Sequence, residues 1–77
     1  MKTAYKHISF ISNEMFQGKP RYTCINNKTT SPLADVFWYK SWKKFCITFR
    51  EETVFDEGCL RDIADFLDEL KKADKNK

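Results

Sequence analysis

The clearest pattern in the chain is a helical repeat of apolar residues in its last third, EGCLRDIADFLDELKK. Asp56 lies directly before this stretch and is a good N-cap, because its carboxylate can accept hydrogen bonds from free amides of the first turn. Phe55 and Leu60 fall at the positions of a hydrophobic staple. The spacing predicts an amphipathic helix whose apolar stripe faces a core. The residues of that stripe are Cys59, Leu60, Ile63, Phe66, Leu67 and Leu70.

Four segments upstream of this helix have the alternation of β-strands. The fourth alternates most cleanly, because Phe45, Ile47 and Phe49 fall on one face, which we expect to be the core face. The stretch NEMFQGKP between the first two segments contains glycine and proline, so it predicts a loop. The expected strands span residues 5–12, 21–25, 33–39 and 43–51.

The third and fourth strands are separated by Lys40-Ser41-Trp42, a connection so short that the pair must be antiparallel. Alternation puts Phe37 and Trp38 on opposite faces of the third strand. We expect Phe37 to lie in the core and Trp38 to lie on the face that the helix leaves open. The open-face neighbours expected for Trp38 are Lys44, Cys46, Thr48 and Arg50.

Four strands followed by one helix predict a small two-layer α+β domain of order ββββα. In this arrangement the helix covers one face of an antiparallel sheet and the other face stays open. We expect residues 1–72 to form this single domain and residues 73–77 to form a polar C-terminal tail.

Length and composition agree with one folded domain. The chain has 77 residues, of which 42% are hydrophobic and 32% are charged, as in globular proteins. A chain this short buries only about 60% of its unfolded surface, so its stability needs support. Aromatic residues make up 16% of the chain, which favours dense aromatic packing or a partner chain as that support.

The cysteines Cys24, Cys46 and Cys59 are odd in number and form no CxxC pair. Closely spaced ligand pairs are the usual mark of structural zinc, so we expect reduced thiols and neither a metal nor a cofactor. No stretch reaches the roughly 18 apolar residues that span a bilayer, and the N-terminus lacks the apolar core of a signal peptide. We therefore expect a cytoplasmic protein without a membrane partner.

Charge is divided along the chain. Residues 1–50 contain nine basic and two acidic residues, a net charge of +7, whereas residues 51–77 contain five basic and nine acidic residues, a net charge of −4. A basic first part and an acidic last part are a hint about partners that the overall charge of +3 conceals.

The basic part contains the stretch FWYKSWKKF, in which aromatic rings alternate with lysines. A basic sheet face that carries an aromatic side chain is an arrangement that stacks bases and neutralises phosphates. We expect a non-enzymatic binding module whose partner is nucleic acid, with Trp38 stacking on a base. The residues expected to contact the partner are Trp38, Lys40, Trp42, Lys43, Lys44 and Arg50.

Two alternatives remain for the same residues. The aromatics can serve only to clamp neighbouring strands of a hairpin. They can also form a protein interface, either as a regulatory or inhibitory module that binds another protein, or in a homodimer through the open sheet face. The chain is expected to be a monomer or such a homodimer.

Catalysis is not expected. His7 paired with Cys46 or Cys59 would lack an orienting or oxyanion group, so no catalytic residues are assigned. The carboxylates around Asp56 are explained by helix capping. The acidic outer face of the helix is expected to be solvated, with a surface for a basic partner as the alternative.

Residues 38–70 resemble a group of short proteins found in phages, prophages and related mobile elements. The shared pattern is W-Y-x-x-W-[RK]-x-[YF]-x-F, then an acidic turn, then T-x-F-x-x-x-C-L-x-[DE]-I-A-x-F-[IL]-x-x-L, with Ile47 replacing an aromatic residue here. The resemblance implies a phage or mobile-element protein acting in the host cytoplasm, and it supplies no catalytic residues. Under the protein-interface alternative, it implies a host or phage protein as the partner, for example a host defence protein. The other positions that match are Trp38, Tyr39, Trp42, Lys43, Phe45, Thr53, Phe55, Cys59, Leu60, Ile63, Ala64, Phe66 and Leu70.

Overall fold

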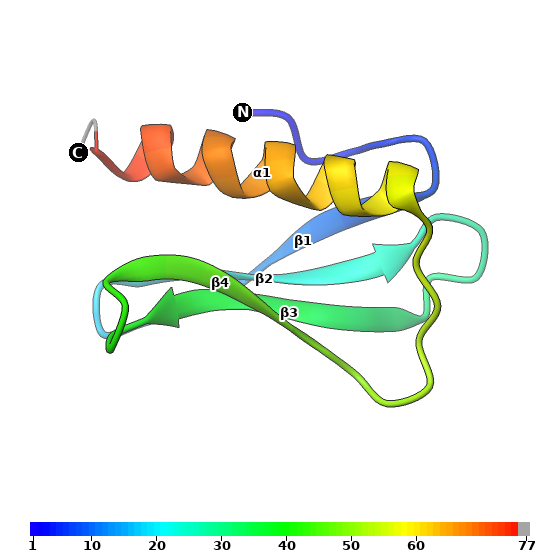
Figure 1. The fold of residues 1–77 in the computed structure, drawn as a ribbon. Coiled ribbons are helices and arrows are strands. Elements are labelled where there is room, and N and C mark those ends of the chain that lie inside the picture. The colour runs from blue at the N-terminus through cyan, green and yellow to red at the C-terminus, as the bar shows by residue number, and fades with distance from the viewer. Residues whose placement is uncertain (76–77) are drawn as a thin grey trace.

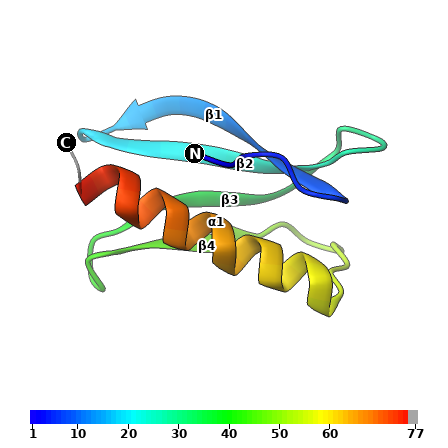
Figure 2. The same cartoon turned by 90° about the horizontal axis from the view of Figure 1, so that it is seen from above.

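The computed structural model describes residues 1–75. They form a four-stranded antiparallel sheet with one helix on one face (Figure 1). The strands lie in sequence order in the sheet, and the helix crosses them obliquely on one side (Figure 2). The predicted ββββα architecture is confirmed. The elements are β1 (Ile8–Phe16), β2 (Lys19–Asn26), β3 (Pro32–Tyr39), β4 (Lys44–Phe49) and α1 (Glu57–Lys75).

The helix begins at Glu57, as the sequence predicts, and it ends three residues beyond the predicted end at residue 72. Asp56 accepts a hydrogen bond from the Cys59 amide at 2.8 Å, which confirms the N-cap. This bond also lowers the pKa of the Asp56 carboxyl. The helix continues to Lys75, so the first three residues of the expected tail are helical, and residues 76 and 77 lie outside the described part.

The core lies between α1 and the covered face of the sheet. Phe66 is fully buried, and its ring stacks on Phe10 with centroids 3.9 Å apart while Tyr22 meets it edge-on at 5.0 Å. Burying a side chain of this size contributes about 1.5–3 kcal/mol. Leu60 of the predicted stripe is instead 48% exposed, so the side of the helix that faces the core is rotated away from Leu60. The buried helix residues are Cys59, Ile63, Phe66 and Leu70.

The stretch predicted as a loop between the first two strands is a β-hairpin. β1 and β2 meet at a two-residue turn, Gln17-Gly18, in which both residues have positive φ (52° and 79°). Such turns match the twist of paired strands, and glycine adopts this conformation without strain. Phe16 therefore faces Lys19 across the strand pair. Pro20 is tolerated because it lies in an irregular stretch, before the regular pairing that begins at Arg21.

The side chains of β3 face opposite to the prediction. The connection between β3 and β4 has four residues, 40–43, and Trp38 pairs with Phe45 rather than with a residue of the open face. Because side chains alternate along a strand, one added loop residue moves every side chain of β3 to the other face. Trp38 thus packs against the core on the helix side, with its ring 5.0 Å from that of Phe45, and Phe37 lies on the open face.

A chain of polar side chains crosses the open face. The Asn13 amide donates to the Thr23 hydroxyl, which donates to Asp35 at 3.4 Å. Arg50 donates to both oxygens of the same Asp35 carboxylate, at 3.1 and 3.2 Å. This polar chain therefore separates two groups of apolar side chains on the open face. In residues 1–75 no helix is long and apolar enough to cross a membrane.

A candidate nucleic-acid interface at one end of the sheet

The two hairpin turns and the C-terminal end of α1 lie at the same end of the molecule, as both views of the fold show (Figures 1 and 2). We call this the turn end; it comprises residues 16–21, 37–44 and the last two turns of α1. The opposite end, which we call the far end, comprises the β2–β3 loop, the connection from β4 to α1 and the first turns of α1. Antiparallel pairing in sequence order forces this arrangement, since successive turns must alternate between the two ends.

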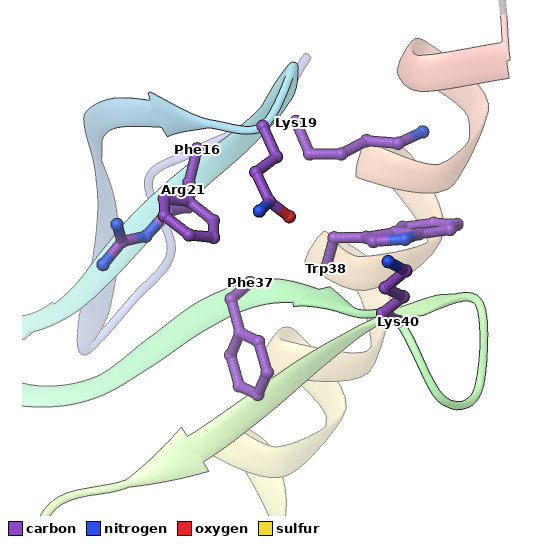
Figure 3. Close-up of a pocket in the computed structure, with 7 residues that line it drawn as sticks. Phe16, Lys19, Arg21, Phe37, Trp38 and Lys40 are labelled. Carbon is purple, nitrogen blue, oxygen red and sulfur yellow. The ribbon is translucent and has the colours of Figure 1, made fainter.

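A groove of about 640 Å³ lies at the turn end (Figure 3). It is formed by the ends of β1 and β2 on one side and the end of β3 on the other. It brings together aromatic and basic side chains that are far apart in the sequence. The residues that line it are Phe16, Gln17, Lys19, Arg21, Phe37, Trp38 and Lys40.

The wall of the groove nearest the helix is fixed in place. Lys19 places its Nζ 4.2 Å from the Trp38 ring centroid and 2.7 Å from Asp74 Oδ2 near the end of α1. The indole lies between Lys19 and Lys40 in Figure 3. A partly exposed ion pair of this kind contributes about 1 kcal/mol or less. The ion pair nevertheless neutralises the charge of Lys19. Lys19 and Phe45 together cover the Trp38 ring, so neither Lys19 nor Trp38 is free to contact a partner.

The opposite wall has free groups. The Phe16 side chain is 58% exposed, and the Arg21 guanidinium lies 5.7 Å from its ring centroid. Within residues 1–75, Arg21 and Lys40 form no ion pair. Phe16 and Arg21 therefore present an aromatic ring and an unneutralised cation together.

The β3–β4 turn adds a second exposed ring. Trp42 is 66% exposed and meets the Tyr39 ring edge-on, with centroids 5.0 Å apart. The Trp42 amide donates to the Tyr39 carbonyl at 3.2 Å, and the Lys43 amide donates to the Lys40 carbonyl at 3.2 Å. These bonds hold the turn, and they fix the indole in a position where it projects from the molecule.

A second groove, of about 370 Å³, runs between the β3–β4 hairpin and the C-terminal half of α1. Its apolar floor is made of Trp38, Phe45 and Leu67, and its rim carries lysines from both the hairpin and the helix, together with Asp68 and Asp74. The helix lysines thus extend the basic surface of the hairpin. The rim lysines are Lys43, Lys44, Lys71 and Lys75.

The far end has the opposite charge. Acidic side chains outnumber basic ones in the connection to α1 and in its first turns, whereas basic side chains outnumber acidic ones at the turn end. A partner with negative charge is attracted to one end and repelled by the other. The acidic residues there are Glu51, Glu52, Asp56, Glu57 and Asp62.

The structure separates the six residues that the sequence singles out. Lys40 lines the first groove, Lys43 and Lys44 line the second, and Trp38 lines both. Trp42 projects beside them. Arg50 does not belong to this surface, because it follows the far end of β4 and is bound by Asp35. Trp38 lines the groove, but its ring is packed against the core, so it is not the exposed stacking residue that the sequence predicts.

Sequence reasoning missed the contribution of β1, β2 and the helix end. Phe16, Lys19 and Arg21 fall in or beside the stretch read as a loop, although a glycine at the second position of a two-residue turn is a hairpin signal. Lys71 falls at the end of the predicted helix and Lys75 in the expected polar tail, and neither is among the contact residues predicted from the sequence. Only the pairing of distant strands shows that these residues share one end.

The buried thiols have a packing role. Cys24 and Cys59 lie in the core, where burial raises the pKa of the Cys24 thiol to about 11 and also raises the pKa of Cys59. A thiol with a raised pKa stays protonated and unreactive near neutral pH. Within the described residues, no cluster of His, Cys, Asp and Glu side chains is arranged to hold a metal ion.

Comparisons with known proteins supply no template. No family model matches the chain, and neither a curated protein nor a solved structure is found to be similar. Function is therefore inferred from the charge, exposure and geometry of the turn end.

Proposed function

We propose that this protein is a non-enzymatic module that binds nucleic acid through its turn end. The observation that carries the proposal is the presence at one end of two cations that form no ion pair within residues 1–75, Arg21 and Lys40, together with two exposed rings, Phe16 and Trp42. Lysine and arginine side chains supply affinity by neutralising phosphates and releasing their counterions. Exposed rings supply faces on which bases can stack.

The charge of the remaining surface supports the same orientation. Lys43, Lys44, Lys71 and Lys75 rim the second groove and widen the basic area. The acidic far end disfavours binding in the reverse orientation, because like charges repel. The resemblance to phage and mobile-element proteins is consistent with a module that acts on nucleic acid in a host cytoplasm, and that origin is part of the proposal.

The proposal is tested by fluorescence anisotropy with labelled oligonucleotides at low salt. We expect binding in the micromolar range that weakens steeply as salt is added. Lys40→Glu is expected to weaken binding and to lower the slope of log affinity against log salt by about one. Lys28→Glu is the matched control, because Lys28 is exposed but lies in the β2–β3 loop at the far end.

Two results would contradict the proposal. One is the absence of binding at about 50 µM protein in low salt, which lies within the range of ordinary non-specific binding. The other is an equal loss of affinity for Lys40→Glu and Lys28→Glu, which would mean that net charge and not the turn end determines binding.

A protein interface on the open sheet face is the second candidate. No described element covers this face, and Ile11 is half exposed on it while Ile25 and Leu33 are partly buried. The Asp35–Arg50 ion pair crosses the same face, however, and interrupts its apolar area. Light scattering tests the homodimer form of this candidate, and a monomeric mass at about 100 µM protein removes it.

A further inference from the structure

We infer that the ligand of the turn end is single-stranded nucleic acid, held with bases stacked on Phe16 and Trp42; this inference rests on the proposed function. The two rings come from different hairpins, Phe16 from the end of β1 and Trp42 from the β3–β4 turn. They are exposed by 58% and 66% respectively. The choice between single and double strands follows from what lies between them.

Two further rings, Phe37 and Tyr39, share the turn end with Phe16 and Trp42, and we call these four rings the track. Phe37 lines the groove with Phe16 and meets Tyr39 edge-on, with centroids 6.1 Å apart. Tyr39 in turn meets Trp42 edge-on at 5.0 Å. In an edge-to-face pair, the ring that contributes its edge keeps its faces available, so these contacts orient the rings without stacking them on one another.

Cations lie along this track at intervals. Arg21 lies beside Phe16, Lys40 lies in the groove, and Lys44 pairs with Tyr39 across β3 and β4. Alternating rings and cations suit a strand whose bases and phosphates are both accessible. Neighbouring strands lie about 4.8 Å apart, so the track, which runs from β1 to the turn between β3 and β4, crosses roughly 12 Å of sheet. This length accommodates roughly three or four stacked nucleotides at about 3.4 Å each.

A duplex does not use this track. Its bases are already stacked within the helix, and its outer surface offers phosphates and groove edges, so the projecting rings find no base faces. If charge alone determined binding, the duplex would bind more tightly, because its charge density is higher. A preference for the single strand is therefore a signature of stacking and not of the basic surface.

The test compares a labelled oligothymidylate of about 12 nucleotides with a mixed-sequence duplex of the same length, a size within the range of known single-strand sites. We expect the single strand to bind more tightly at about 100 mM salt. We expect Trp42→Ala to weaken single-strand binding by about five-fold or more and to leave duplex binding little changed. Trp42→Phe keeps a stacking face and is expected to retain most of the affinity.

Intrinsic fluorescence gives a second readout that does not depend on affinity. The chain contains two tryptophans, so Trp38→Phe leaves Trp42 as the sole indole. Its emission is expected to be quenched by the oligothymidylate and to change little with the duplex. Val54→Ala is the control for removal of an exposed apolar side chain, because Val54 is 90% exposed at the far end.

The failures of the two proposals are distinguishable. Equal or tighter binding of the duplex, or single-strand binding unaffected by Trp42→Ala, overturns the single-strand inference. In that case binding that still depends on Lys40 keeps the proposed function. Binding of neither probe overturns both.

Discussion

The two ends of the sheet carry opposite net charges. They also differ in whether their charged side chains are bound by other groups of the fold. At the far end, Asp56 caps α1 and Arg50 binds Asp35, so charged side chains there support the fold. At the turn end, Arg21 and Lys40 form no ion pair among the described residues and lie beside exposed rings. The comparison teaches that charge sign alone does not identify a binding surface; what matters is whether the charge is already used by the fold.

This difference has a simple thermodynamic consequence. Replacing an exposed, unpaired cation at the turn end is expected to change binding and to leave the free energy of unfolding nearly unchanged. Replacing Asp56 or Arg50, whose charges are bound within the fold, is expected to do the reverse. Three further variants test this separation.

The largest effect is expected from reversing two charges on the rim of the second groove. Lys43→Glu with Lys44→Glu adds repulsion where the proposed function needs attraction, and we expect at least about a ten-fold loss of affinity with a salt slope lower by about two. Anisotropy titrations at several salt concentrations measure both quantities. The melting temperature is expected to stay nearly constant, since both lysines are exposed.

Glu51→Lys is the matched control for this double variant. It changes charge at the far end, so it is expected to leave binding unchanged or slightly stronger. A loss of affinity in Glu51→Lys comparable to that of the double variant would contradict the division between the two ends.

Asp56→Ala is expected to act on stability alone. Loss of an N-cap hydrogen bond destabilises a helix by about 0.5–2 kcal/mol, and about 1 kcal/mol lowers the melting temperature of a domain this small by roughly 4–8 °C. Asp56→Asn keeps a capping acceptor and is expected to lose much less. Urea unfolding measures the difference, and an unchanged midpoint in Asp56→Ala would show that the cap does not matter.

The same cap predicts how stability depends on pH. The Cys59 amide lowers the pKa of Asp56 in the folded state. The cap therefore contributes stability above the unfolded pKa, near 4, and this contribution is lost as the pH falls through the lower folded pKa. The gap in unfolding free energy between the natural chain and Asp56→Ala should thus be full at pH 7 and narrow below about pH 4. A gap that is constant with pH would contradict a role for the charge.

Local patterns in the sequence predict the helix well and the sheet less well. The N-cap at Asp56 depends on contacts within one turn, so the start of α1 follows from neighbouring residues. The orientation of β3 depends on the length of a turn. Reading residues 40–42 as the connection, instead of 40–43, moves Trp38 from the covered face to the open face.

The groove was beyond local prediction for a related reason. Phe16, Lys19 and Trp38 meet only because β1, β2 and β3 pair in sequence order, which brings the first hairpin turn beside the end of β3. Alternation within each strand says which side chains share a face, but it does not say which strand is the neighbour. The basic and aromatic residues of FWYKSWKKF, residues 37–45, do gather at the turn end. The alternation of residues did not predict on which face of the sheet each ring lies.

The smallest effects are expected from Arg50→Gln, a change at a residue that the sequence places among the expected contacts and that lies away from the turn end in the structure. Its ion pair with Asp35 is exposed, so we expect a loss of at most about 1 kcal/mol in unfolding free energy. Affinity for either oligonucleotide is expected to stay within about two-fold of the natural chain, because Arg50 follows the far end of β4 and its charge is neutralised. Anisotropy and urea unfolding on the same preparation measure both quantities. If Arg50→Gln instead weakened binding as much as Lys40→Glu does, the partner would have to extend along the whole open face, and the interface would not be confined to the turn end.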